Sequence, residues 1–206
     1  MSWQLFGAPT GNCFRAAIAL EEVGFEFAVR PLDLAKGEHK EPWFLALNPA
    51  GKVPVLVGED TRGRHVLTQS NAIMMFADMQ KEGVLLPVEK RARTLALERY
   101  FYVVTEAIAA NGAAFALERR GDIEAAATLY EQSAVAIAAM ERFAEQAPYL
   151  GGDSFSLADI AGFVITRAMN QRLPAELPFL MQWYARIEER PAVQRGIRRL
   201  VRAQSE

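Results

Sequence analysis

The pattern of hydrophobic and polar positions divides the 206 residues into two parts. In the first eighty residues, short apolar runs alternate with segments whose apolar residues recur at helical spacing. This pattern predicts a strand, a helix, a strand, a helical turn, two strands and a helix. In order, these segments are 3–6, 13–23, 25–29, 43–45, 53–57, 65–67 and 69–80.

The connections between these segments predict a mixed sheet. A helix joins the first two strands, so we expect them to be parallel neighbours. A turn that contains Gly58, Asp60 and Gly63 joins the last two, so we expect an antiparallel hairpin. Gly24 is placed to end the first helix as a C-cap residue. The order of elements is that of a thioredoxin-like domain.

The rest of the chain has a different composition. Beyond about Glu89 it is alanine-rich, and the ranges 91–117 and 122–146 follow the helical spacing without a strand pattern. Ser156 and Asp159 form a capping-box pattern at the start of a further helix. Prolines then punctuate two shorter helices: Pro174, Pro178 and Pro191.

We therefore expect an α+β chain of two domains. Residues 1–80 form a thioredoxin-like domain with a mixed four-stranded sheet, residues 81–90 a linker, and residues 91–206 an all-helical domain.

Charge and composition restrict the function. The net charge is −2, with 23 basic and 25 acidic residues, so no bulk charge favours nucleic acid or a membrane surface. A basic run near the end has helical spacing, and we expect it to be a solvated helix end. Its members are Arg195, Arg198, Arg199 and Arg202.

The low numbers of cysteine and histidine argue against a disulfide-bonded protein and against a metal site. Cys13 is the only cysteine, so no internal disulfide forms, and with two histidines no metal-ligand spacing arises. We see no secretory signal and no transmembrane span, and we expect a cytoplasmic protein.

Two neighbouring segments predict a ligand site. In Gly51–Leu56 a proline heads an apolar strand, where the main chain of Val53 can pair with another peptide. In Leu67–Ile73 the residues Gln69 and Ser70 open a helix, whose N–H groups favour an anion. A small, anionic, peptide-like ligand fits both. Val-Pro at a strand start is also common without any ligand.

Taken together, these motifs resemble those of the cytosolic glutathione S-transferases. The resemblance covers the whole chain, and it implies a glutathione-binding domain, a helical domain that helps form the electrophile site, and a homodimer. Four motifs carry it: Pro9-Thr10-Gly11-Asn12 with Ile18-Ala19-Leu20-Glu21-Glu22, Leu47-Asn48-Pro49 with Gly51-Lys52-Val53-Pro54, Gln69-Ser70-Asn71-Ala72-Ile73, and Ser156 with Asp159.

The resemblance implies roles for the glutathione-binding residues. Val53, followed by a cis Pro54, pairs through its main chain with the cysteinyl unit, and Gln69 and Ser70 hold the γ-glutamyl end. Most relatives have an acidic residue at the position of Gln69, so the uncharged glutamine implies a lower affinity for glutathione. His39 and Lys52 match positions that hold the glycyl carboxylate in some classes. For His39 an exposed loop position is an equally good interpretation.

The residue that activates the glutathione thiol is left open among three. Some classes of this family activate the thiol with a tyrosine or a serine of the first domain. No tyrosine precedes Tyr100, and Ser2 and Ser70 lie outside the turn after the first strand, so neither residue type fits that role here. The turn resembles that of the bacterial nu-class enzymes, which favours Asn12 and Thr10. Both residues are also good helix caps. Cys13 lies one residue after the beta-class cysteine position and ranks third, with a small buried hydrophobe as the alternative.

Three functions follow from the resemblance. The first is conjugation of glutathione, as a co-substrate and without any other cofactor, to an unidentified hydrophobic electrophile. The second is glutathione-dependent reduction of a disulfide. The third is a non-catalytic glutathione-binding scaffold.

Overall fold

A computed structural model describes residues 3–61 and 63–203. The chain divides into two compact units: the chain up to Leu85 with the segment from Glu189 onward, and Leu86–Glu188. The sequence placed everything from residue 91 in one helical domain. The last helix differs from that expectation, because it packs on the first helix and so belongs to the first unit.

The first unit is built on a mixed four-stranded sheet in the order β2-β1-β3-β4. β1 pairs in parallel with β2 and antiparallel with β3, which pairs antiparallel with β4. The predicted parallel pair, the hairpin and the thioredoxin-like fold are thereby confirmed. The strands are β1 (Trp3–Gly7), β2 (Phe27–Pro31), β3 (Val55–Asp60) and β4 (Gly63–Thr68).

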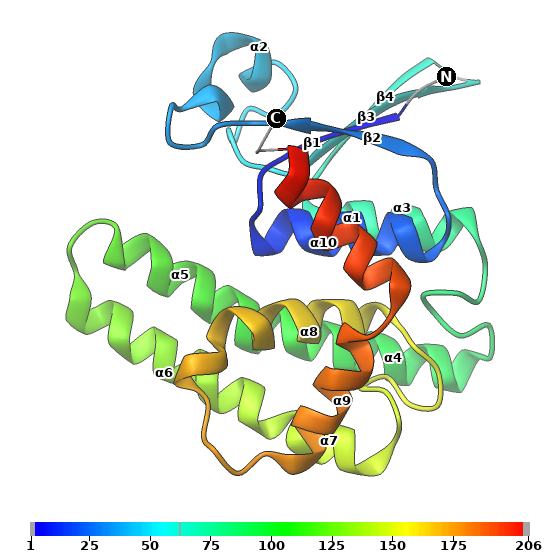
Figure 1. Ribbon diagram of the computed structural model, residues 1–206, viewed down its shortest axis with the longest axis vertical. Helices are drawn as coiled ribbons and strands as arrows, with labels where there is room; N and C mark the ends of the chain where they lie inside the picture. Colours follow the sequence, from blue (N-terminus) through cyan, green and yellow to red (C-terminus); the bar gives the residue numbers. More distant parts are fainter. Residues whose placement is uncertain (1–2, 62, 204–206) are drawn as a thin grey trace. The chain divides into compact units, whose positions relative to one another are not determined.

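Helices cover both faces of this sheet (Figure 1). α1 and α3 lie on one face, where Leu5 and Leu56 are fully buried. On the other face, α2 places Phe44 in a cluster with Leu32 and Val55. The helical elements of this unit are α1 (Gly11–Glu22), the 3-10 helix η1 (Glu38–Lys40), α2 (Pro42–Leu45), α3 (Ser70–Gln80) and α10 (Pro191–Ala203).

Local hydrogen bonds explain where α1 begins and ends. Thr10 is the N-cap, and its side chain accepts a hydrogen bond from the N–H of Cys13 at 3.4 Å, so the helix begins two residues before the predicted range. Gly24 adopts φ +70°, as its predicted C-cap role requires. The N–H of Phe25 then bonds back to the carbonyl of Leu20 at 2.9 Å. Because Phe25 belongs to this cap, β2 begins later than predicted.

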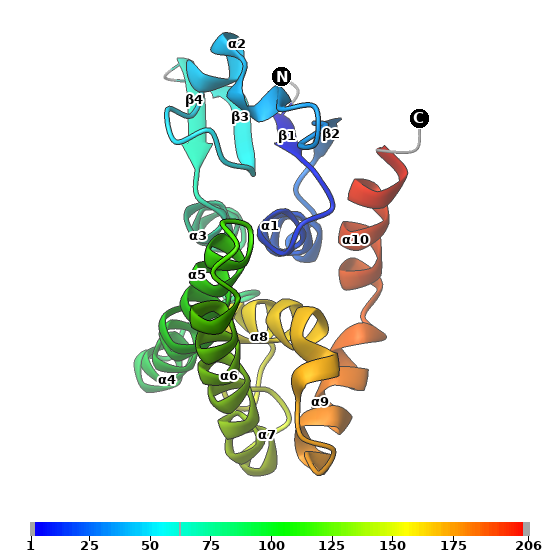
Figure 2. The same ribbon diagram turned by 90° about the vertical axis from the view of Figure 1, so that its left-hand side faces the viewer.

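The last helix, α10, packs closely on α1 (Figure 2). A Cβ atom added to Gly196 would lie 2.8 Å from the main-chain nitrogen of Ile18, so only glycine allows this approach. Val193 and Leu200, on the same face of α10, are buried. α10 therefore completes the helical layer next to α1.

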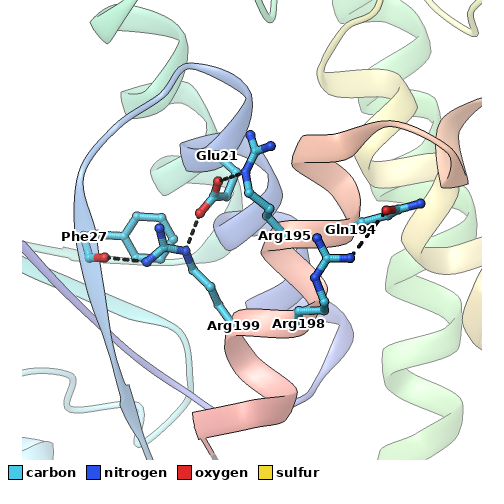
Figure 3. A network of polar contacts seen from close by, with 6 residues as sticks. All are labelled: Glu21, Phe27, Gln194, Arg195, Arg198 and Arg199. Carbon is cyan, nitrogen blue, oxygen red and sulfur yellow. Dashed lines mark hydrogen bonds and ion pairs between the residues drawn. The ribbon is translucent and has the colours of Figure 1, made fainter.

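Two arginines of α10, Arg195 and Arg199, are exposed as predicted, but both also form ion pairs that the prediction did not include (Figure 3). Arg195 Nε donates to Glu21 at 2.6 Å, and Arg199 Nε pairs with the other oxygen of that carboxylate. Arg199 Nη1 also donates to the carbonyl of Phe27 at 3.0 Å. The prediction missed these pairs because Glu21 lies more than 170 residues earlier in the chain. Arg198, which bonds only its helix neighbour Gln194 at 3.4 Å among the contacts shown, is exposed as expected.

The second unit is entirely helical over its described residues, apart from one isolated bridge. The predicted range 91–117 is one continuous helical stretch with a π-helical segment, whereas the range 122–146 breaks at Met140. The elements are α4 (Lys90–Tyr102), the π-helix η2 (Val103–Ile108), α5 (Ala109–Glu118), α6 (Ile123–Ala139), α7 (Glu141–Gln146), α8 (Leu157–Met169), the 3-10 helix η3 (Asn170–Arg172) and α9 (Pro178–Glu188).

The predicted capping box starts α8 and anchors this unit. Asp159 accepts the N–H of Ser156 at 2.8 Å, and the Ser156 hydroxyl caps the helix. Buried Asp159 also accepts from the N–H of Leu150 and from Trp183 Nε1, both at 2.8 Å.

By length and composition alone, Lys90–Glu118 could cross a membrane, but core helices pass the same test and this stretch packs against α6 and α8.

Candidate functional site

Three connections meet at one edge of the sheet. Val55, the first residue of β3, pairs with Phe6 near the end of β1 and with Thr68 at the end of β4. The turn before α1, the segment before β3 and the start of α3 therefore leave the sheet at the same edge. Every site residue predicted from the sequence lies in one of these connections, except His39.

The segment before β3 presents main-chain groups at this edge. The peptide bond between Val53 and Pro54 is cis, as the resemblance implied. Val53 is half-buried, and among the described residues no hydrogen bond to its main chain is found. Its N–H and C=O can therefore pair with an extended peptide.

Asn48 fixes the loop that leads to Val53. Its side chain is buried, donates to the carbonyl of Lys52 at 2.6 Å and accepts from the N–H of Ala50 at 3.1 Å. Between them Gly51 has φ +55°, a conformation that favours glycine. These bonds hold the loop in one shape and leave the Lys52 side chain exposed.

Basic residues gather beside this loop. Lys40 Nζ donates to the carbonyl of Gly51 at 3.0 Å, and a Cβ on Gly51 would lie 3.0 Å from the carbonyl oxygen of His39. η1 therefore lies against the loop that carries Lys52. No sequence motif marks Lys40, and only its position in the fold shows the contact. The structure brings His39 near Lys52 in this way, and their role in binding stays a prediction.

The start of α3 provides the second connection. Gln69 precedes the helix with φ +72° and ψ 117°, which is strained for a residue with a side chain. Its side chain is exposed. Ser70 is the first residue of the helix and is 6% exposed. The N–H groups of this first turn give the edge a partial positive charge.

The start of α1 provides the third connection and carries the three candidates for thiol activation. Asn12 is exposed and Thr10 is half-buried. Cys13 is fully buried, and burial raises the pKa of its thiol despite a lowering hydrogen bond from the Thr10 side chain. Its sulfur lies 3.0 Å from the position of a Cβ on Gly7. Cys13 therefore behaves as a core residue, whereas Asn12 and Thr10 have surface that a ligand can reach.

Arg15 also belongs to this site, although no sequence motif assigned it there. Arg15 is 4% exposed, and its side chain bonds both Asn12 at the start of α1 and Ser70 at the start of α3, so it joins these two connections. A signal for it exists in the sequence: Arg15 lies three positions before Ile18, on the apolar side of the helix. A lone cation at such a position needs a buried partner.

Comparison with known proteins places both units in one family. Residues 1–78 match the family model described as glutathione S-transferase, N-terminal domain, and residues 92–191 match the corresponding C-terminal domain. Glutathione S-transferase 3 of Zea mays is 34% identical, over 94% of this chain and 92% of the relative. The disulfide-bond oxidoreductase YfcG of Escherichia coli is 30% identical, over 91% of each.

Solved structures agree with this match. The glutathione transferase homologue of Lodderomyces elongisporus, described with two glutathione molecules per subunit, superposes with a TM-score of 0.82. The two sequences are 27% identical, and the match covers 96% of this chain and 98% of the homologue.

Proposed function

We propose that this chain, which belongs to the cytosolic glutathione S-transferase family, binds glutathione at the described sheet edge and activates its sulfur as a thiolate. The thiolate then attacks a small hydrophobic electrophile. One observation carries the assignment to this edge: the cis Val53–Pro54 segment, the start of α3 and the start of α1 converge there. The chain is accordingly a glutathione transferase.

The binding roles follow from the chemistry of each connection. The main chain of Val53 pairs with the cysteinyl unit, as one strand pairs with another. Ser70 and the first-turn N–H groups of α3 hold the γ-glutamyl carboxylate, and Gln69 accepts from its ammonium group. Lys52 and His39 hold the glycyl carboxylate at the opposite end, where charge-assisted bonds are strongest.

Thr10 and Asn12 are the residues we assign to the sulfur. A free thiol has a pKa of about 8.5, so only roughly 3% is ionised at neutral pH. Lowering this pKa by about two units requires roughly 2.7 kcal/mol of preference for the thiolate. One or two donors at a helix start can supply that preference. Cys13 is not part of this proposal, because it is fully buried.

Reduction of a disulfide by glutathione is the second candidate function. The observation that favours it is the 30% identity to a disulfide-bond oxidoreductase over 91% of the chain, together with the Thr10–Asn12 turn. The same thiolate serves both reactions: it displaces a leaving group from carbon in conjugation, or a thiolate from sulfur in reduction. We further propose a homodimer in the cytoplasm, the usual state of this family.

Steady-state kinetics with two probes tests the proposal. Wild-type protein is assayed with glutathione and either chlorodinitrobenzene or hydroxyethyl disulfide. In Ser70→Ala, loss of a donor to a carboxylate should raise the KM for glutathione by about 10-fold to 100-fold. Asn12→Ala should lower kcat with either probe.

Ser154→Ala, at an exposed serine of the other unit, is the matched control and should behave as wild type. The faster of the two probes identifies the principal activity. Unchanged kinetics in both site variants would refute the assignment of the site, and no turnover with either probe would point to a non-catalytic scaffold.

A further inference from the structure

Arg15 is a buried cation shared by two parts of the site. Arg15 is 4% exposed, and its Nη2 atom donates to Asn12 Oδ1 at 2.5 Å and to Ser70 Oγ at 3.0 Å. Asn12 lies one turn earlier on α1, whereas Ser70 opens α3. A single nitrogen therefore contacts the residue assigned to the sulfur and the residue assigned to the γ-glutamyl carboxylate.

The chemistry of guanidinium decides how its two partners are oriented. A guanidinium carries only donors, so the Asn12 amide must turn its oxygen toward Arg15. The amide NH₂ group is then directed away from Arg15, on a side chain that is exposed. In the same way the Ser70 oxygen accepts from Arg15, and its hydroxyl proton stays available to another acceptor. Asn12 and Ser70 can each donate or accept a hydrogen bond, and the contact with Arg15 leaves both as donors toward an anionic ligand.

We propose that Arg15 is a positioning residue for the thiolate: it holds the Asn12 amide so that its NH₂ group faces the glutathione sulfur. This inference rests on the proposed glutathione site. Without Arg15, the amide can turn its oxygen toward the sulfur, and the repulsion would destabilise the thiolate. Arg15 acts through Asn12 and does not itself touch the ligand.

A purely structural role makes a different prediction. Arg15 also ties α1 to α3, so its loss lowers stability whether or not it orients Asn12. A structural tie changes the melting temperature and the amount of folded protein, but it leaves the pKa of the bound thiol unchanged. That pKa, read from thiolate absorbance in the ultraviolet during a pH titration of the glutathione complex, separates the two roles.

The test compares Arg15→Lys with the matched control Arg190→Lys. Arg190 pairs with Glu22 through two bonds of 2.8 Å in the same unit and lies outside the site, so its variant reports lost stability alone. Lysine keeps the buried charge of Arg15 but not its planar fork. We expect Arg15→Lys to raise the pKa of the bound thiol by about one unit, and Arg190→Lys to leave it unchanged.

Two further results decide the mechanism. In an Asn12→Ala background, Arg15→Lys should no longer shift the thiol pKa, because the oriented amide is gone. If Arg15→Lys does not fold, NMR of the wild-type side-chain amides replaces it: the Asn12 NH₂ protons should shift with glutathione and not with S-methylglutathione, which has no thiolate. Equal shifts with both ligands would overturn the inference.

The outcomes also separate this inference from the function on which it rests. A wild-type protein that binds no glutathione would overturn the proposed function and the inference with it. A wild type that binds glutathione, with the same thiol pKa in Arg15→Lys, would overturn the inference alone.

Discussion

The ion-pair cluster between α1 and α10 predicts that the effect of Glu21→Gln on the unfolding free energy changes sign when its arginine partners are absent (Figure 3). The Glu21 side chain is only 7% exposed, whereas those of Arg195 and Arg199 are 47% and 44% exposed. Removing the arginines leaves a buried carboxylate without its partners. Removing the carboxylate leaves two cations that water can reach.

These exposed fractions determine how much each substitution should change the unfolding free energy. An uncompensated buried charge costs about 3–5 kcal/mol, and we reduce this to about 2–3 kcal/mol for Arg195→Gln/Arg199→Gln because solvent reaches the arginine side of the cluster. Glu21→Gln alone loses charge-assisted bonds at a screened site, about 1 kcal/mol. Added to the double arginine variant, however, Glu21→Gln removes the stranded charge and should restore about 1–2 kcal/mol.

Urea unfolding followed by circular dichroism measures the unfolding free energy of four proteins. They are the wild type, Glu21→Gln, Arg195→Gln/Arg199→Gln and the triple variant. We expect Glu21→Gln to lower the unfolding free energy in the wild-type background and to raise it in the double arginine background. Gln194→Ala, which removes an exposed contact to Arg198 outside the Glu21 cluster, is the control and should change the unfolding free energy little. If Glu21→Gln destabilised both backgrounds equally, the carboxylate would not be buried as described.

Three further predictions concern single residues of the first unit. Gln69→Glu should lower the dissociation constant of glutathione by about 3-fold at low salt, because a carboxylate pairs with the ligand ammonium; an unchanged constant would contradict that contact. Cys13→Ala should keep kcat/KM within about 2-fold of wild type while lowering stability by about 1 kcal/mol, because its sulfur only packs; a loss of activity at full stability would return Cys13 to the site. Gly196→Ala should lower the unfolding free energy by about 1–3 kcal/mol, because its Cβ would meet the main chain of Ile18, and calorimetric melting measures the shift.

The sequence predicts the elements that local patterns encode. The mixed sheet, Thr10 and Gly24 at the ends of α1, and the capping box at Ser156 follow from residue types within a few positions of one another. Boundaries were displaced where a neighbouring cap used the residue, as Phe25 shows at the start of β2. The break at Met140 had no glycine or proline to mark it.

Contacts between segments that are distant in the sequence could not be predicted from local patterns. Arg15 meets Ser70 across 55 residues, and Arg195 meets Glu21 across 174. Arg195 looks solvated on its own helix, and the apolar side of α1 on which Arg15 lies does not identify its partner on α3. Only the packing of α3 and α10 against α1 shows that each has a partner, and that packing depends on the whole unit.

The direct test of the central claim is isothermal titration calorimetry of reduced glutathione at pH 7, in buffers of different ionisation enthalpy. If the site binds glutathione as a thiolate with a pKa near 6.5, binding should release about 0.7 proton per chain. S-methylglutathione should bind without that release. Binding of glutathione with no proton release, or no binding heat in any buffer, would contradict the account.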